Sequence, residues 1–268
     1  MTKKNKRKSH TKKKRKGTSK KKKYHIKKIK DPPFSKKDHR GSDATKGMID
    51  YHYQHYSNII DYLEIICNKN KTLSKKICFI GDDHIDAYLT FDLKQYKKGI
   101  HSKYLSDDLL IKIIKECIHD KKTKYIPLML ETVKGKKHNH ANIILIDIDK
   151  KNIELFEPHG LRKTDSILHG IKYSYIKKKK ALHDFFMKYL PGFNIINVVD
   201  IIEGSAFQSI YDAHSGYCIT WSLLYCHYRL LNPKIPYSQI ITYLHKTIKL
   251  NHILRYAQHI EEVLKNES

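Results

Sequence analysis

Cys218 is the residue in this sequence that is best placed to act as a nucleophile. It follows Ser215 and Gly216 and opens a stretch in which apolar residues recur about every 3.6 positions, a pattern that predicts a helix ending at Asn232-Pro233. The N–H groups and the dipole at the start of a helix favour an anion, and they therefore lower the pKa of a thiol. The plainer interpretation is that Cys218 is one more small, buried apolar residue.

His140 and Glu157 are a candidate base and its orienting carboxylate. His140 begins an unbroken apolar run that predicts a central strand, and residues 152–157 predict an antiparallel partner. Two registers are open, across a loop of two residues or of four, and in both Glu157 points to the same sheet face as His140. A histidine and a carboxylate at one end of a hairpin are what a nucleophilic site needs. The alternative is that both are solvated strand ends.

The other periodic stretches predict the elements that position these residues. Helices are expected at residues 51–68, 107–119, 172–190, 238–250 and 252–264, and strands at 124–130, 138–149, 152–157 and 194–202. Asp82 or Asp83 is expected to cap a helix that carries Ile85 and Leu89. The run from Lys177 to Lys180 is interpreted as a solvated helix face.

The positive charge of the chain is concentrated at its N-terminal end. Residues 1–40 contain 20 Lys and Arg and two Asp, in a chain with a net charge of +26. This composition predicts a disordered Lys/Arg-rich tail at residues 1–45 and one domain at residues 46–268. By charge alone the tail would attract nucleic acid, an acidic protein or an import receptor, and a solubilising role is the alternative.

Cysteine usage and hydropathy limit the setting of the protein. The five cysteines form no C-x-x-C pair and are odd in number, which predicts reduced thiols in an intracellular protein without a structural metal site. Cys226 is expected to pack in the core. No run of 18 apolar residues predicts a membrane span, and no apolar segment follows the basic N-terminus as a secretory signal requires.

Four segments, in this order, resemble the adenain and SUMO-protease superfamily of cysteine peptidases, the ubiquitin-like proteases, and especially its large-DNA-virus branch. Residues 79–89 resemble the N-terminal segment of the family, and His140 with Asp147 resembles its catalytic histidine strand. Residues 153–157 resemble the strand that ends in the acidic or amide triad member, and residues 216–233 resemble the viral nucleophile helix.

This resemblance implies a papain-like, adenain-like α+β fold, with a central mixed sheet flanked by helices. It implies a His140, Glu157 and Cys218 triad, with Gln208 in the oxyanion hole. The glutamine of the family lies about six residues before the cysteine, where this chain has Asp212, so Gln208 is assigned as the nearest glutamine. His138 shares a face with His140 and is an alternative base.

The resemblance further implies cleavage of peptide or isopeptide bonds after small residues, often Gly-Gly, in viral structural polyproteins or ubiquitin-like conjugates. No cofactor is needed, and the expected location is intracellular, in the virion or the host cytoplasm or nucleus. Two alternatives stay open. One is an acyltransferase with the same triad; the other is a non-catalytic basic virion or nucleic-acid-associated protein. Residues 1–40 would make any nonspecific nucleic-acid contact, and no membrane partner is expected.

Overall fold

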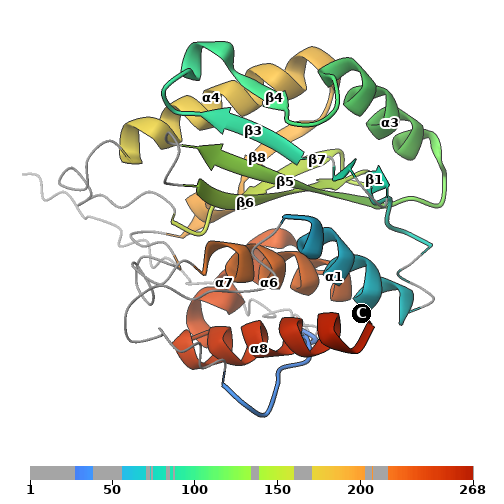
Figure 1. The fold of residues 1–268 in the computed structure, drawn as a ribbon, viewed down its shortest axis with the longest axis vertical. Helices are drawn as coiled ribbons and strands as arrows, with labels where there is room; N and C mark the ends of the chain where they lie inside the picture. The colour runs from blue at the N-terminus through green and yellow to red at the C-terminus, as the bar shows by residue number, and fades with distance from the viewer. Residues whose placement is uncertain are drawn as a thin grey trace, which may run out of the picture.

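A six-stranded mixed sheet lies between two layers of helices (Figure 1). The computed structural model describes residues 28–38, 56–70, 73, 75–82, 85–86, 88–133, 139–159, 171–202, 207 and 217–267. The helices are α1 (Tyr56–Asn68), α3 (Asp107–His119), α4 (Ile171–Tyr189), α6 (Cys218–Leu231), α7 (Tyr237–Thr247) and α8 (Leu250–Glu267), with short 3₁₀ helices η2 (Tyr96–Lys98) and η3 (Val198–Ile201). The strands are β1 (Gly81–Asp82), β2 (Ile85–Asp86), β3 (Tyr88–Asp92), β4 (Ile100–Ser102), β5 (Tyr125–Val133), β6 (Asn139–Asp147), β7 (Asn152–Phe156) and β8 (Asn194–Asn197). This architecture confirms the α+β fold with a mixed sheet.

The strand order in the main sheet is β4-β3-β5-β6-β7-β8. β3 with β5 and β7 with β8 are parallel pairs, and the other neighbours are antiparallel. β5 and β6 are central and are buried on both faces, as their nearly continuous apolar sequences predict. β1 and β2 form a separate two-stranded sheet.

The β6–β7 hairpin sets the register of the candidate base and carboxylate. Asp147 pairs with Asn152 and Ile143 pairs with Phe156. The connection is therefore the four-residue loop, the looser of the two registers that the sequence left open. Glu157 follows Phe156 directly, at the level of Asn142 on β6.

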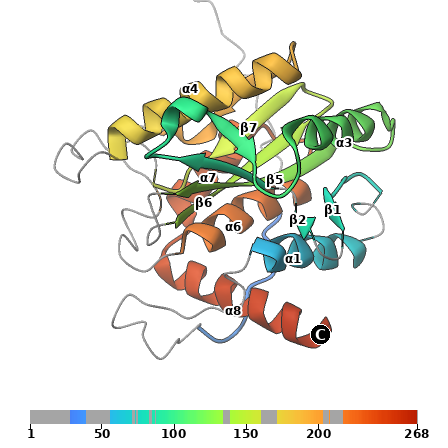
Figure 2. The ribbon, with the colours of Figure 1, turned by 45° about the horizontal axis from the view of Figure 1, so that its top comes forward.

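Each face of the sheet packs against its own helices. Ile144, Ile146 and Leu155 pack with α3 and α4, whereas Ile143, Leu145 and Phe156 pack with α1, α6, α7 and α8. The two layers lie above and below the sheet in Figure 1, and the view in Figure 2 shows α4 crossing over β7. Because side chains alternate along a strand, His140 and Asn142 belong to the face that α4 covers.

Helix α6 is buried along nearly its whole length, and a charged cluster attaches it to the hairpin. The guanidinium of Arg229 donates to both carboxylate oxygens of Glu154, at 2.8 and 2.9 Å, and to Oδ2 of Asp147 at 3.2 Å. Tyr225 also donates to Glu154, at 2.7 Å. All of these groups are buried, so they fix the position of α6 on β6 and β7.

Residues 28–38 lie against the helical layer that contains α6. Oδ1 of Asp31 accepts hydrogen bonds from Tyr228 at 2.8 Å and Tyr243 at 2.7 Å. The backbone of Lys30 exchanges two hydrogen bonds with the Asn232 amide. This segment falls within the tail predicted for residues 1–45, and its contacts attach it to the folded part of the chain.

Three sequence predictions about the fold are wrong. The strand expected at residues 194–202 ends at Asn197 and is followed by the 3₁₀ helix η3. Residues 85–86 and 88–92 are strands and do not form a capped helix, because Tyr88, Leu89 and Phe91 are buried and β3 pairs in parallel with β5. Tertiary pairing here outweighs the local capping signal. The cysteines are also not all reduced: Cys78 and Cys117, which are 39 positions apart in the sequence, form a disulfide that joins the chain before β1 to α3.

None of the helices in the described part of the chain combines the length and the apolar character needed to cross a membrane.

Candidate active site

Three elements bring His140, Glu157 and Cys218 together at one end of the sheet. His140 lies near the start of β6 and Glu157 directly after the end of β7, and these ends are adjacent because the strands are antiparallel. Cys218 is the first residue of α6, which packs on β6 from the helical layer on the other side of the sheet from α4. The site is thus assembled where the two helical layers meet the end of the hairpin.

His140 contacts both of its predicted partners. Its Nε2 is bonded to Oε1 of Glu157, and its ring is also hydrogen-bonded to the Cys218 thiol. Burial acts to lower the pKa of His140, but the Glu157 charge and the bond to Cys218 outweigh it and raise that pKa to about 9. The side chain is 21% exposed, so the ring remains reachable from solvent. An imidazole held in this way is suited to keep the proton that the thiol releases.

Glu157 is almost fully buried and is surrounded by donors. Oε1 contacts His140 and accepts the backbone N–H of His159 at 3.1 Å, and Oε2 contacts the ammonium of Lys178. Burial acts to raise the pKa of Glu157, but the charges of His140 and Lys178 outweigh it and hold that pKa well below its usual range. Glu157 is therefore a carboxylate at neutral pH.

Two of the groups around Glu157 were not foreseen from the sequence. Lys178 was interpreted as part of a solvated helix face, but it is 3% exposed and its ammonium also donates to Oδ1 of Asn142 at 2.9 Å. The His159 ring lies against that of His140, with centroids 4.3 Å apart. The spacing of Lys178 before Leu182 and Phe186 is the signal for its burial, since residues four apart share a helix face.

Cys218 differs from the other two thiols of the described structure. It is 9% exposed and contacts His140. Cys67 and Cys226 are buried in the apolar core, where burial raises the pKa of Cys67 to about 12 and the pKa of Cys226 well above its usual range. The predicted core position of Cys226 is confirmed, whereas Cys218 is hydrogen-bonded to the His140 imidazole.

Two predicted residues cannot be placed. Gln208, expected in the oxyanion hole, and His138, the alternative base, lie outside the described residues. In the part of the chain that the structure describes, no three His, Cys, Asp or Glu side chains are grouped so that they could hold a metal ion.

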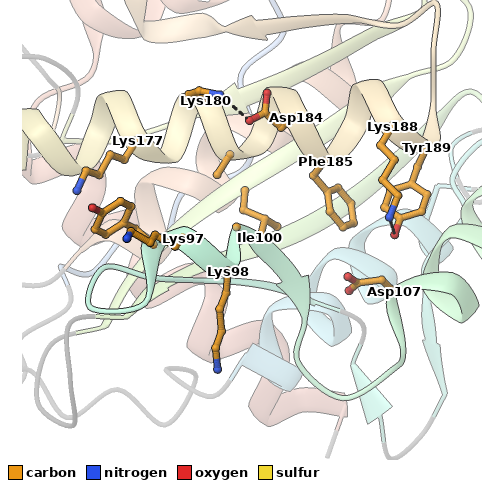
Figure 3. Close-up of a pocket in the computed structure, with 13 residues that line it drawn as sticks. Lys97, Lys98, Ile100, Asp107, Lys177, Lys180, Asp184, Phe185, Lys188 and Tyr189 are labelled. Carbon is orange, nitrogen blue, oxygen red and sulfur yellow. Dashed lines mark hydrogen bonds and ion pairs between the residues drawn. The ribbon is translucent and has the colours of Figure 1, made fainter.

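A pocket of about 500 Å³ lies between η2, β4 and α4, and it does not include the candidate site (Figure 3). Its charged lining consists of Lys97, Lys98, Asp107, Lys177, Lys180, Asp184 and Lys188. Lys180 is paired with Asp184 at 2.9 Å, and Lys177 lies over the Tyr96 ring at 3.0 Å from its centroid. The described residues that line it include no cysteine and no histidine.

No protein-family model matches the chain, and neither does any curated protein sequence. Among solved structures the chain is similar to the ASFV pS273R protease, with 14% identity and a TM-score of 0.42, over 76% of this chain and 66% of that one. It is similar to the SUMO protease Ulp1, with 11% identity and a TM-score of 0.40, over 78% of this chain and 77% of that one. It is also similar to the Chlamydia trachomatis effector ChlaDUB1, with 11% identity and a TM-score of 0.35, over 79% and 69% of the two chains. These similarities concern the fold and assign no role to an individual residue.

Proposed function

We propose that this chain is a cysteine peptidase of the ubiquitin-like protease type, with Cys218 as nucleophile, His140 as general base and acid, and Glu157 as the residue that orients His140. The observation that carries the proposal is the position of His140, which is bonded at once to a buried carboxylate and to the thiol at the start of α6. A thiol, an imidazole and a carboxylate in this order are the parts of an activated nucleophile.

The chemistry follows from these contacts. His140 takes the Cys218 proton, and the thiolate attacks the carbonyl carbon of a peptide or isopeptide bond. The imidazolium then donates its proton to the leaving amine as the C–N bond breaks, which leaves a thioester on Cys218. Water, deprotonated by His140, hydrolyses the thioester and releases the carboxylic acid and the thiol. Backbone N–H groups at the start of α6 and the Gln208 side chain are proposed to stabilise the oxyanion.

The substrates proposed are those that the family resemblance implies. They are bonds after small residues of the Gly-Gly type, in viral structural polyproteins or ubiquitin-like conjugates. The basic residues 1–40 are proposed to make nonspecific contacts with nucleic acid, in a virion or in the host cytoplasm or nucleus.

Turnover of fluorogenic peptides that end in Gly-Gly, together with labelling by ubiquitin-like proteins carrying a C-terminal propargylamide, tests the activity. We expect turnover and a covalent adduct on Cys218 in the wild type, neither in Cys218→Ser, and both in Cys226→Ser, which changes a core thiol of the same helix. Turnover that persists in Cys218→Ser would show that the nucleophile is assigned wrongly.

The same preparation separates the alternatives. Transfer of an acetyl group from acetyl coenzyme A, without peptide hydrolysis, would indicate the acyltransferase. An inert Cys218, combined with DNA binding that weakens steeply with salt and is lost when residues 1–40 are deleted, would indicate the non-catalytic basic protein.

A further inference from the structure

Lys178 is a buried cation in contact with the candidate triad. Its side chain is 4% exposed, and its ammonium contacts Oε2 of Glu157 and Oδ1 of Asn142. A buried ammonium is costly unless it is paired and hydrogen-bonded. Both requirements are met here by groups at the end of the β6–β7 hairpin, so the position of Lys178 is tied to that of Glu157.

Asn142 fixes the direction of the lysine. Its amide nitrogen faces the carbonyl oxygen of Leu130 at 3.3 Å and Oγ1 of Thr132 at 3.4 Å, both on the neighbouring strand β5. The amide oxygen is therefore turned toward α4, where it accepts from Lys178. Strands β5 and β6 thus hold the ammonium against one oxygen of Glu157 and leave the other oxygen for His140.

The neighbouring lysines of α4 behave differently. Lys177 and Lys180 line the pocket between η2, β4 and α4 that Figure 3 shows, and Lys179 pairs with Asp200 at the surface, at 2.8 Å. Lys178 lies on the face that carries the buried residues Leu182 and Phe186. In a run of four lysines, one alone has been placed at a core position.

We propose that Lys178 is a positioning residue of the Cys218, His140 and Glu157 site: it holds one carboxylate oxygen of Glu157, directs the other at His140, and offsets part of the carboxylate charge. This inference rests on the proposed function and adds a fourth group to it.

The charges of the site explain what the lysine adds. With the thiol deprotonated, the groups alternate in sign from Lys178 through Glu157 and His140 to Cys218. Glu157 is faced by His140 from β6, by His159 after β7 and by Lys178 from α4, and Cys218 of α6 reaches it through His140. Without Lys178, the Glu157 carboxylate would stabilise the protonated His140 more strongly, and the imidazolium would hold its proton more tightly. Lys178 weakens that hold, so His140 can pass its proton to the leaving amine.

The test is an NMR titration of the His140 ring in the full chain, in a Cys218→Ala background so that the thiol does not titrate with it. Lys178→Gln removes the charge and keeps a polar contact, and Lys178→Met removes both. We expect either variant to raise the pKa of His140 by about one unit, because His140 then loses a neighbouring cation that contacts the same carboxylate. Lys178→Arg, which keeps the charge, and Lys179→Met, which removes the neighbouring exposed charge, should leave the His140 pKa unchanged.

A His140 pKa that is the same in Lys178→Gln and Lys179→Met, with only a lower melting temperature in the former, would overturn the proposal and leave Lys178 with a packing role. A rise of the His140 pKa in Lys178→Arg equal to that in Lys178→Gln would also overturn the proposal. The titration requires no peptidase activity. Failure of the proposed function would instead appear as an unreactive Cys218 in the parent protein, whatever the lysine does.

Discussion

Glu157 is the residue on which the polar contacts of the site converge. It accepts from His140, from the His159 backbone and from Lys178, and it is buried. A buried carboxylate with this many donors is strongly favoured in its ionised form, and its contribution to stability depends on that charge. Removing the charge while keeping the shape would leave Lys178 buried without its counter-ion.

Glu157→Gln is therefore expected to reduce the free energy of unfolding by about 3–5 kcal/mol at pH 7. Because the pKa of Glu157 is lower in the folded state than in the unfolded chain, its stabilisation is present above about pH 4.5 and is lost as the pH falls. At pH 3 the difference in the free energy of unfolding between wild type and variant should be smaller than at pH 7 by about 2 kcal/mol. Urea unfolding at the two pH values measures it.

Asp149→Asn is the matched control, because it removes an exposed acid from the same hairpin, where Asp149 pairs with Lys124 at 2.6 Å. Its effect should stay below about 1 kcal/mol at pH 7. If Glu157→Gln lowers the free energy of unfolding by the same amount at pH 3 and pH 7, the pKa of Glu157 is not lowered in the folded protein.

Helix α6 both presents Cys218, the proposed nucleophile, and holds it in place. Cys218 is its first residue, and Arg229 lies in its last turn, paired with Glu154 and Asp147 of the hairpin that carries His140. Since His140 and Glu157 belong to the same hairpin, this buried ion pair fixes the distance between the thiol and its base. The Arg229 and Asn232 region resembled the viral nucleophile helix in sequence, and its residues serve here to anchor the helix.

Arg229→Met is expected to destabilise the protein by about 3–5 kcal/mol, because it leaves the buried Glu154 carboxylate without a cation and removes one of the two cations that contact Asp147. Lys150→Met is the matched control, since Lys150 pairs with the same Asp147 at 3.0 Å but is 40% exposed. It should cost less than about 1 kcal/mol. Equal losses in the two variants, measured by denaturant unfolding, would show that the buried cluster does not anchor α6.

At the scale of the whole molecule, segments far apart in the sequence meet on α6. Residues 28–38 pack on α6, α7 and α8, and the hairpin packs on the other side of α6. Asp31 connects this N-terminal segment to Tyr228 of α6 and Tyr243 of α7. The segment therefore adds stability to the layer that carries Cys218.

Asp31→Ala is expected to lower the free energy of unfolding by about 1–3 kcal/mol, since two tyrosine hydroxyls lose a charged acceptor. Asp38→Ala, at an exposed position of the same segment, should change it by less than about 0.5 kcal/mol. Thermal and denaturant unfolding measure both. If the two variants are equally stable, residues 28–38 do not contribute to the folded layer.

Much of the site could be predicted because its signals are local. The strand alternation of β6 and β7 placed His140 and Glu157 on one face, and the apolar rhythm after Cys218 placed the thiol at the start of a helix. Composition alone does not distinguish Lys178 from Lys177 or Lys179; the four-residue spacing of Lys178 before Leu182 and Phe186 is what places it on the buried face of α4. The Cys78–Cys117 disulfide depends on the packing of α3 beside the chain before β1, which no local pattern encodes.

The rate at which iodoacetamide alkylates Cys218, measured by peptide mass mapping between pH 6.5 and 9.5, is the most direct test of the proposed site. With His140 holding its proton up to about pH 9, the wild-type thiol should react at pH 6.5 at least about tenfold faster than in His140→Ala, and the two rates should converge near pH 9.5. Cys67 and Cys226 are internal controls and should stay slow throughout. Equal rates in the wild type and His140→Ala at pH 6.5 would contradict the activated thiol.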